Sequence, residues 1–216
     1  MALELYFHPL SSYSQKAVIA FYENDISFEP NVLNIGDPVQ SAEVKALWPI
    51  GKFPVLRDET RGVTVGEASI IIEYLALHRP GPTPLVPADP DAAWQVRMRD
   101  RFFDFYVNDQ IGIVIADRAR PVAQKNTMDV EAARKRLRTA LDVIEAEMAT
   151  RTWAAGDAFS MADCAAAPAL FYANDVMPFA DSHPHTMRYH QRLSQRSSYA
   201  RVLKEAEPYL HLVPKE

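Results

Sequence analysis

The sequence predicts a small α/β domain followed by an all-helical domain, and three observations predict this fold class. Short β-rich runs alternate with helical patterns over residues 1–79, five of the sixteen prolines fall within residues 80–90, and residues 91–216 show helical spacing throughout. Proline fixes φ and removes a backbone donor, so neither a helix interior nor a central strand tolerates this density. We therefore expect residues 80–90 to be a linker between two domains.

The first domain should begin with a βαβ unit. Leu3–Phe7 is rich in strand-forming residues, and Ser12–Glu23 repeats apolar residues at helical spacing. Ile26–Leu33 then returns to the period-two alternation of a strand. Because a helix crosses over between them, the two strands should lie parallel in one sheet.

The rest of this domain should complete a mixed sheet. After a short helix near Ser41–Leu47, Phe53–Arg57 and Gly62–Val65 resemble two strands joined by a polar turn, which suits an antiparallel hairpin. Glu67–His78 follows, with its apolar residues on one helical face. The predicted order is βαβ, helix, ββα, with the helices packed against a small sheet.

Amphipathic helices should build the second domain. Asp91–Arg118 is one long helical pattern crowded with aromatic residues, and Asp129–Thr150 should pack against it as an antiparallel partner. Ser160 and Asp163 precede an alanine-rich run and form a capping-box signature, in which the carboxylate bonds back to a backbone N–H. Cys164, inside that run, should be a small buried hydrophobic residue.

Composition excludes several classes of protein. The 216 residues are 48% hydrophobic and 24% charged, as in ordinary globular proteins. A net charge of −5 disfavours nucleic acid as a partner, because phosphate binding requires clustered positive charge. The single cysteine excludes an internal disulfide, and no apolar run approaches the length of a membrane span. Since Met1–His8 also begins directly as a strand with no leader pattern, we expect a cytoplasmic protein that has no membrane partner.

Three segments could carry chemistry. Ser11–Ser14, with the sequence SSYS, lies where the first strand meets the first helix, and free backbone N–H groups and the helix dipole favour an anion there. One serine suffices to cap the helix, and three exceed that need. In Gly51–Leu56, GKFPVL, a cis Phe53–Pro54 bond would leave the Phe53 backbone groups facing outward. Gly66–Ser69, GEAS, is a helix start whose N–H groups suit a carboxylate.

Together these segments resemble the glutathione transferase family. The likeness runs in order from SSYSQKAVIAFYEN through GKFPVL and EASIIIEYL to FSMADCAAAPAL and MRYHQRLSQRSSYARVL, so it covers almost the whole chain. It implies a thioredoxin-like first domain that binds glutathione and a helical second domain that supplies most of the pocket for a small apolar electrophile. It also implies a homodimer in which the first domain of one subunit packs on the helices of the other.

The resemblance implies that Ser11 is the catalytic residue. SSYS is similar to the same element of the serine-type branches, including the SSCS of the zeta class, where the catalytic hydroxyl lies five residues before a basic residue, here Lys16. Ser12 and Ser14 would then be supports or caps. Thioredoxins and glutaredoxins carry paired cysteines at this place, and neither is present here. Dithiol chemistry is therefore excluded, and the sulfur must come from glutathione as a co-substrate.

A serine hydroxyl at this place can ionise the glutathione thiol without a general base. Lowering an ordinary thiol pKa of about 8.5 by about two units takes roughly 2.7 kcal/mol. A hydrogen bond to a charged group supplies about 1.5–3 kcal/mol, and a helix N-terminus adds about 0.3–1 kcal/mol. We therefore expect Ser11 to act as a hydrogen-bond donor to the thiolate rather than as a nucleophile.

The glutathione-binding residues that the resemblance implies lie in all three segments. They are Ser11, Lys52, Phe53, Pro54, Glu67, Ala68 and Ser69. The Phe53 backbone would pair with the cysteinyl part of glutathione, Lys52 would contact a carboxylate, and Glu67 would bind the γ-glutamyl amine. The family usually has serine after this acidic residue, but here Ala68 follows and the serine is displaced to Ser69. The helix N-terminal amides would then hold the γ-glutamyl carboxylate.

Aromatic residues supply one alternative hydrogen-bond donor to the thiolate and most of the expected electrophile pocket. Tyr6 stands near the end of the first strand, about one residue out of register with the catalytic phenol of the tyrosine-type transferases. The expected pocket combines residues beside Ser11 with aromatic residues from the first helix of the second domain. It comprises Leu10, Tyr13, Phe102, Phe105 and Tyr106.

No metal site is predicted. His183, His185 and His190 lie close together in the sequence, but Pro184 indicates a surface loop. No carboxylate or cysteine lies nearby at the spacing that metal ligands require.

The leading hypothesis is a glutathione transferase of the detoxification type, in which the thiolate formed beside Ser11 attacks an electrophilic carbon. The likeness of SSYS to the zeta class leaves open a glutathione-dependent isomerase of the maleylacetoacetate type. Its dicarboxylate would require arginines, and neither Arg118 nor Arg120 can be assigned to it from the sequence. Ala68 leaves open a third possibility, a non-catalytic protein that binds glutathione or a hydrophobic ligand.

Overall fold

The first part of the chain forms a four-stranded mixed sheet with three helices. The computed structural model describes residues 3–34 and 36–215, and Met1, Ala2, Ile35 and Glu216 lie outside it. The strand order is β2-β1-β3-β4; β1 is parallel to β2 and antiparallel to β3, and β3 is antiparallel to β4. The elements are β1 (Leu3–Phe7), α1 (Ser12–Glu23), β2 (Glu29–Val32), α2 (Pro38–Leu47), β3 (Val55–Asp58), β4 (Val63–Gly66) and α3 (Ala68–His78). This confirms the predicted βαβ-α-ββα order and the thioredoxin-like arrangement.

Element ends differ from the predictions where local hydrogen bonds decide them. The second strand is shorter than predicted, because the Ile26 backbone N–H donates to Phe21 O at 2.9 Å and continues the turn that ends α1. Helix α2 begins before the predicted Ser41, because the Asp37 side chain caps it by accepting from the Val39 N–H at 2.9 Å. The Phe53–Pro54 bond is cis.

The second part of the chain is helical, as predicted. Its elements are α4 (Pro90–Phe102), a π-helical turn (Phe103–Asn108), α5 (Asp109–Arg118), a 3₁₀ turn (Val122–Gln124), α6 (Thr127–Met148), α7 (Met161–Val176), α8 (Pro184–Gln195), α9 (Ser197–Ala206) and a second 3₁₀ turn (Glu207–Leu212). The long pattern predicted over Asp91–Arg118 is therefore two α-helices joined by a π-helical turn. The predicted capping box is confirmed, since Asp163 Oδ2 accepts from the Ser160 N–H at 2.9 Å.

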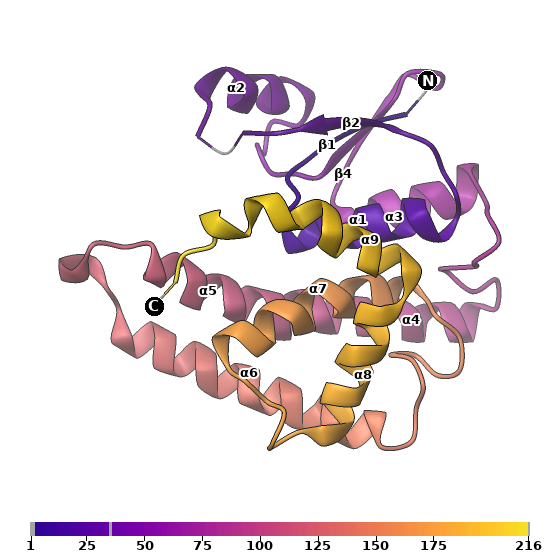
Figure 1. Cartoon of the computed structure of the whole chain (residues 1–216). Helices are drawn as coiled ribbons and strands as arrows, with labels where there is room; N and C mark the ends of the chain where they lie inside the picture. The colour runs from indigo at the N-terminus through magenta and orange to yellow at the C-terminus, as the bar shows by residue number, and fades with distance from the viewer. Residues whose placement is uncertain (1–2, 35, 216) are drawn as a thin grey trace.

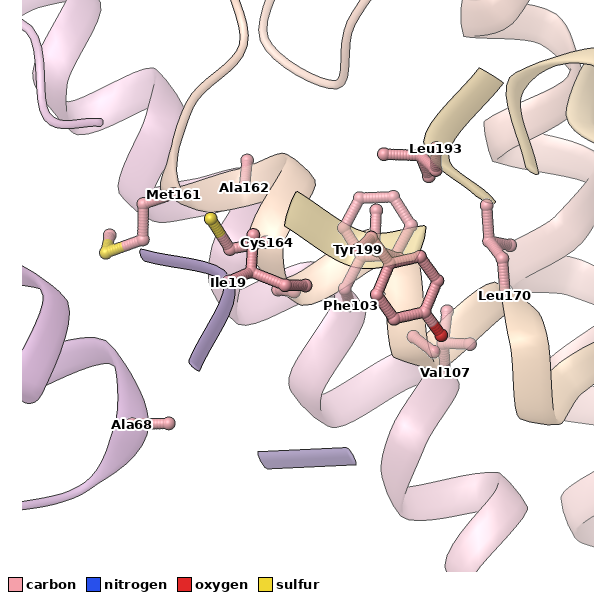
Figure 2. Packing of buried hydrophobic residues seen from close by; sticks show 14 of the residues in the cluster. Ile19, Ala68, Phe103, Val107, Met161, Ala162, Cys164, Leu170, Leu193 and Tyr199 are labelled. Atoms are coloured by element: carbon pink, nitrogen blue, oxygen red, sulfur yellow. The ribbon is translucent and has the colours of Figure 1, made fainter. Parts of the chain in front are cut away.

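Helices α1 and α3 lie between the sheet and the helical domain, and α2 covers the opposite face of the sheet (Figure 1). Along β1, Leu3, Leu5 and Phe7 are buried in the main core, which also contains the buried residues of α7. Figure 2 shows Ile19 of α1 and Cys164 of α7, which belong to one continuous cluster of buried residues. Because the alanines of α7 are small, α1 packs closely against it, and the two domains share one core.

Two predictions about individual residues of the helical domain have different outcomes. Cys164 is fully buried, as predicted, and burial raises the pKa of its thiol well above the ordinary value. Pro184 does not mark a surface loop, because it occupies the first turn of α8, where proline's missing N–H costs nothing. His183 is buried there, with its Nε2 3.0 Å from Asp142 Oδ1.

Three further observations concern membrane spans, metal sites and the segment between the two domains. No helix among the described residues combines the length and the apolar character needed to cross a bilayer. In the described ranges, no three His, Cys, Asp or Glu side chains gather so that they could hold a metal. Residues 79–89, between α3 and α4, carry neither helix nor strand.

Candidate active site between the two domains

Ser11 lies at the turn from β1 into α1 and is itself the cap of that helix. Its Oγ accepts from the Ser14 N–H at 3.2 Å, and its backbone N–H donates to His8 O at 3.0 Å. The cap is therefore Ser11, whereas the sequence suggested Ser12 or Ser14 for this role. Ser14 is buried instead, and its Oγ accepts from the His8 N–H at 3.3 Å. Accepting the capping bond occupies a lone pair of the Ser11 hydroxyl and leaves its O–H able to donate.

Buried side chains fix the turn that carries Ser11. Gln15 donates from Nε2 to Pro9 O at 2.7 Å, and the Tyr172 hydroxyl on α7 donates to Leu10 O at 2.6 Å. Burial raises the pKa of Tyr172 to about 12, so this phenol stays protonated and keeps donating at neutral pH. The helical domain therefore holds the backbone on the N-terminal side of Ser11 in place.

Two cavities meet at Tyr13. A larger one, of about 940 Å³, contains Ser11 and is lined mainly by apolar residues of α5 and the C-terminal segment. A smaller one, of about 250 Å³, contains charged residues from both domains. Tyr13 and Asp109 line both cavities, and the Tyr13 hydroxyl donates to Asp109 Oδ1 at 3.2 Å. Burial, together with the nearby carboxylates of Asp104 and Asp109, raises the pKa of this phenol, so it stays a donor.

The smaller cavity brings together five of the residues that the resemblance associates with glutathione. They are Lys52, Phe53, Pro54, Glu67 and Ala68. Glu67 precedes α3 with φ +65, a value that non-glycine residues rarely adopt and that is typical of functional sites. Its carboxylate is exposed and bonds to no described residue, so it is available to a cation. Beside it, a Cβ on Gly66 would lie 2.6 Å from Cε2 of Trp48, so only glycine fits against this indole ring.

Ser69 points away from the smaller cavity into a buried ionic cluster. The Lys16 Nζ lies 2.7 Å from Ser69 Oγ, 2.6 Å from Asp100 Oδ1 and 2.8 Å from Asp104 Oδ2. Ser69 Oγ donates to Asp100 Oδ2 at 2.7 Å. Because its hydroxyl is used in this cluster, Ser69 does not line the cavity as its place in the GEAS motif suggested.

Tyr6 lies on the opposite face of the sheet from Ser11. It packs against the small cluster of Leu33, Val44 and Val55, and its hydroxyl donates to Glu4 Oε2 at 3.0 Å. Burial and this carboxylate raise the pKa of the phenol. Tyr6 lines neither of the two cavities, so the structure places Ser11, and not Tyr6, at the larger one.

The aromatic residues expected in the electrophile pocket are divided by the π-helical turn. Leu10 and Tyr13 line the larger cavity, while Phe105 lines the smaller one. Phe102 and Tyr106 line neither; their rings pack on each other with centroids 5.4 Å apart, and Tyr106 is 60% exposed. The wider turn changes which side chains face the first domain. From this part of the chain, the larger cavity is lined by the last residue of the turn, Asn108, and by residues of α5, namely Asp109, Ile111, Gly112, Ile113, Ile115 and Ala116.

Comparison with known proteins gives the family. The family model for the glutathione S-transferase N-terminal domain matches residues 5–83, and the one for the C-terminal domain matches residues 94–197. The GST-like protein YibF of Escherichia coli (strain K12) is 30% identical over 198 residues, which cover 89% of this chain and 94% of YibF. The chain belongs to the glutathione S-transferase family.

Two further similar proteins have a bound ligand or a named reaction of their own. A glutathione S-transferase of Methylobacterium radiotolerans, solved in complex with glutathione sulfonate, matches with a TM-score of 0.82 and 28% identity over 94% of each chain. Maleylacetoacetate isomerase of Rattus norvegicus is 27% identical over 181 residues, covering 81% of this chain and 80% of its own.

This member of the glutathione S-transferase family has further charged residues at the two cavities that the sequence did not reveal. They come from the part of the chain between the start of α4 and the end of α6. Arg101 and Asp104 line the smaller cavity, and Arg120 and Arg136 line the larger one. The buried cluster around Lys16 left one signal in the sequence, because a lysine stands among apolar residues on the buried face of α1. Its carboxylate partners, Asp100 and Asp104, lie more than eighty residues away, which helical periodicity cannot reveal.

Proposed function

We propose that this protein is a glutathione transferase that joins the glutathione thiolate to a small electrophile with an apolar body. The observation that carries the proposal is the position of Ser11, a helix cap whose O–H is able to donate, in a large apolar cavity that meets a small charged one at Tyr13. In the proposed binding mode, the peptide lies in the smaller cavity with its sulfur beside Ser11. The electrophile occupies the larger cavity.

The proposed reaction has two steps. The bound thiol releases its proton to solvent, and the Ser11 hydroxyl and the N-terminus of α1 stabilise the thiolate. The thiolate then attacks the electrophilic carbon; with an aryl halide, a C–S bond forms and halide leaves with the electron pair of the broken bond. Lys52 binds one carboxylate of glutathione, the Phe53 backbone pairs with its cysteinyl part, and Glu67 binds its amine.

The same proposal includes two domains, residues 1–79 and 91–216, joined by a linker at residues 80–90. It also includes a role in detoxification, a cytoplasmic location and a homodimer. Exposed apolar residues on α3 and α4 support the dimer. Ile70 is 53% exposed and Trp94 52% exposed, and the two helices are joined by the pair Arg97–Glu73 at 2.8 Å. A partner subunit would bury this apolar surface.

Affinity and turnover test the proposal together. We expect calorimetry to show saturable glutathione binding, and we expect conjugation to 1-chloro-2,4-dinitrobenzene to fall at least about tenfold in Ser11→Ala, from the loss of a hydrogen bond to a charged group. The absence of glutathione binding, together with tight binding of a hydrophobic dye, would contradict the proposal and favour a non-catalytic carrier.

A specific observation favours a second function, glutathione-dependent isomerisation of a dicarboxylate. Arg120 and Arg136 line the cavity that contains Ser11, and Arg120 also pairs with Asp117 at 3.4 Å. Arg118 is not among the lining residues and pairs with Asp175 at 2.6 Å. Two guanidinium groups suit carboxylate ligands. Isomerisation regenerates the thiol and conjugation consumes it. Turnover of maleylacetoacetate without net loss of glutathione, and at a higher kcat/KM than any aryl halide, would therefore establish the second function in place of the first.

A further inference from the structure

A carboxylate, a guanidinium and the residue that stands in place of the family's usual serine line the same small cavity. Glu67, Ala68 and Arg101 all line this cavity of about 250 Å³. Ala68 has no hydroxyl, and the Ser69 hydroxyl already donates to Asp100 Oδ2 at 2.7 Å. Neither side chain can therefore donate to an anion in the cavity. Two cationic side chains, Lys52 and Arg101, line it, and Arg101 also bonds to Ser69 through Nη2.

One edge of the Arg101 guanidinium bonds to protein groups, and the other edge bonds to no described residue. Its Nε donates to Asp100 Oδ2 at 3.1 Å, and its Nη2 donates to Asp100 Oδ2 at 2.7 Å, to Asp104 Oδ2 at 2.6 Å and to Ser69 Oγ. Its Nη1 donates to no residue that the structure describes, and the side chain is 42% exposed. The anchored edge fixes the plane of the guanidinium, so the two Nη1 hydrogens are pre-oriented for a ligand.

Arg101 shares the two aspartates that anchor it with Lys16. Lys16 is fully buried and forms ion pairs with both Asp100 and Asp104. The cluster therefore contains two cations for two carboxylates, and Glu67, Asp109 and Lys52 add two carboxylates and one ammonium group to the cavity wall. The Arg101 guanidinium also lies over the Phe105 ring, 5.5 Å from its centroid, which keeps it against the wall.

A carboxylate beside a guanidinium is complementary to the end of a ligand that has an ammonium and a carboxylate on one carbon. Glutathione has one such end, the γ-glutamyl residue, and its glycine end has a carboxylate alone. We propose that Arg101 binds the γ-glutamyl α-carboxylate through Nη1, in the role of the hydroxyl that Ala68 lacks, while Glu67 binds the adjacent ammonium. This inference rests on the proposed function, because it presumes that glutathione is the ligand.

A pair of ligands that differ by one group tests the inference. Calorimetry would compare glutathione with 4-aminobutanoyl-cysteinyl-glycine, which lacks only the α-carboxylate. We expect the unsubstituted protein to bind glutathione roughly tenfold to a hundredfold more tightly than this analogue, as for a charge-assisted hydrogen bond. We expect a much smaller difference between the two ligands in Arg101→Met, where only the backbone N–H groups at the start of α3 still face the carboxylate. Ala68→Ser, added to Arg101→Met, should restore part of the preference.

Arg97→Met is the matched control. Arg97 lies one turn earlier on α4 and pairs with Glu73 on the surface at 2.8 Å, so this variant should keep the full preference. If Arg101→Met does not fold, Arg101→Lys replaces it, keeping the charge without the fork, and should show a reduced preference. A preference as large in the Arg101 variant as in the unsubstituted protein would overturn the inference, as would equal affinities in the unsubstituted protein. If glutathione does not bind at all, the proposed function itself fails.

Discussion

Ser11 has two roles in this account, and a pair of substitutions separates them. Ser11→Ala removes both the acceptor that caps α1 and the O–H that donates to the thiolate. Ser11→Asp keeps an acceptor for the Ser14 N–H, now 3.2 Å from the serine oxygen, and places a favourable negative charge at the helix N-terminus. It has no O–H at neutral pH and repels a thiolate.

The two roles differ in the size of the expected effect. Loss of the cap should lower the free energy of unfolding by about 1 kcal/mol. Loss of the hydrogen bond to the thiolate should cost about 1.5–3 kcal/mol, which raises the pKa of the bound thiol by about one to two units. Below both pKa values the thiolate fraction, and with it the rate of conjugation, should therefore fall by about tenfold to a hundredfold.

Urea unfolding measures the first role, and the pH profile of conjugation measures the second. Ser11→Ala should lose both stability and rate, whereas Ser11→Asp should keep the stability of the unsubstituted protein and lose at least as much rate as Ser11→Ala. The reasoning is refuted if Ser11→Ala loses stability but keeps kcat/KM within about twofold at every pH, because Ser11 would then be only a helix cap.

Three further predictions follow from buried and closely packed residues. Lys16→Met leaves two buried aspartates without their lysine and should lower the free energy of unfolding in urea by about 3–5 kcal/mol; a loss under about 1 kcal/mol would contradict it. Burial by itself raises the pKa of the Asp58 carboxyl, yet hydrogen bonds, first the one from the Tyr74 hydroxyl, hold this pKa below the ordinary 3.8. The ionised Asp58 carboxylate therefore stabilises the folded protein above pH 3.8. This stabilisation is lost as the pH falls through the lowered pKa of the folded state. Asp58→Asn should therefore lower the melting temperature at pH 7 and change it little in strong acid, and an equal loss at both pH values would count against this. Gly66→Ala places a Cβ 2.6 Å from the Trp48 ring, which lines the smaller cavity and must move. The variant should therefore bind glutathione more weakly in calorimetry, and an unchanged affinity would contradict this.

The sequence predicted best those elements whose ends depend on neighbouring residues. The first strand and first helix have the predicted bounds, because strand propensity and a serine cap determine them within a few residues. The Asp163 cap is confirmed for the same reason. The predicted start of α2 at Ser41 is late, because an aspartate cap and a proline in the first turn, Asp37 and Pro38, begin the helix earlier.

Features that depend on contacts between distant segments could not be predicted. Helical spacing gives no sign of the π-helical turn at Phe103–Asn108, so Phe102 and Tyr106 were expected in a pocket that they do not line. Ser69 was assigned by its place in a motif, but its hydroxyl is used by Lys16, which is far away in the sequence. Arg101 could not be assigned to the smaller cavity from the sequence, because only the fold brings the end of α4 beside the start of α3, where Ser69 bonds to Asp100.

The central claim is that the protein makes glutathione a stronger acid, and the thiol pKa in the complex tests it most directly. Ultraviolet absorbance of the thiolate, recorded from pH 5 to 10 on the unsubstituted protein saturated with glutathione, gives that pKa without any second substrate. We predict a midpoint about two units below the ordinary thiol value of about 8.5. A midpoint equal to that of free glutathione in the same buffer would contradict the account.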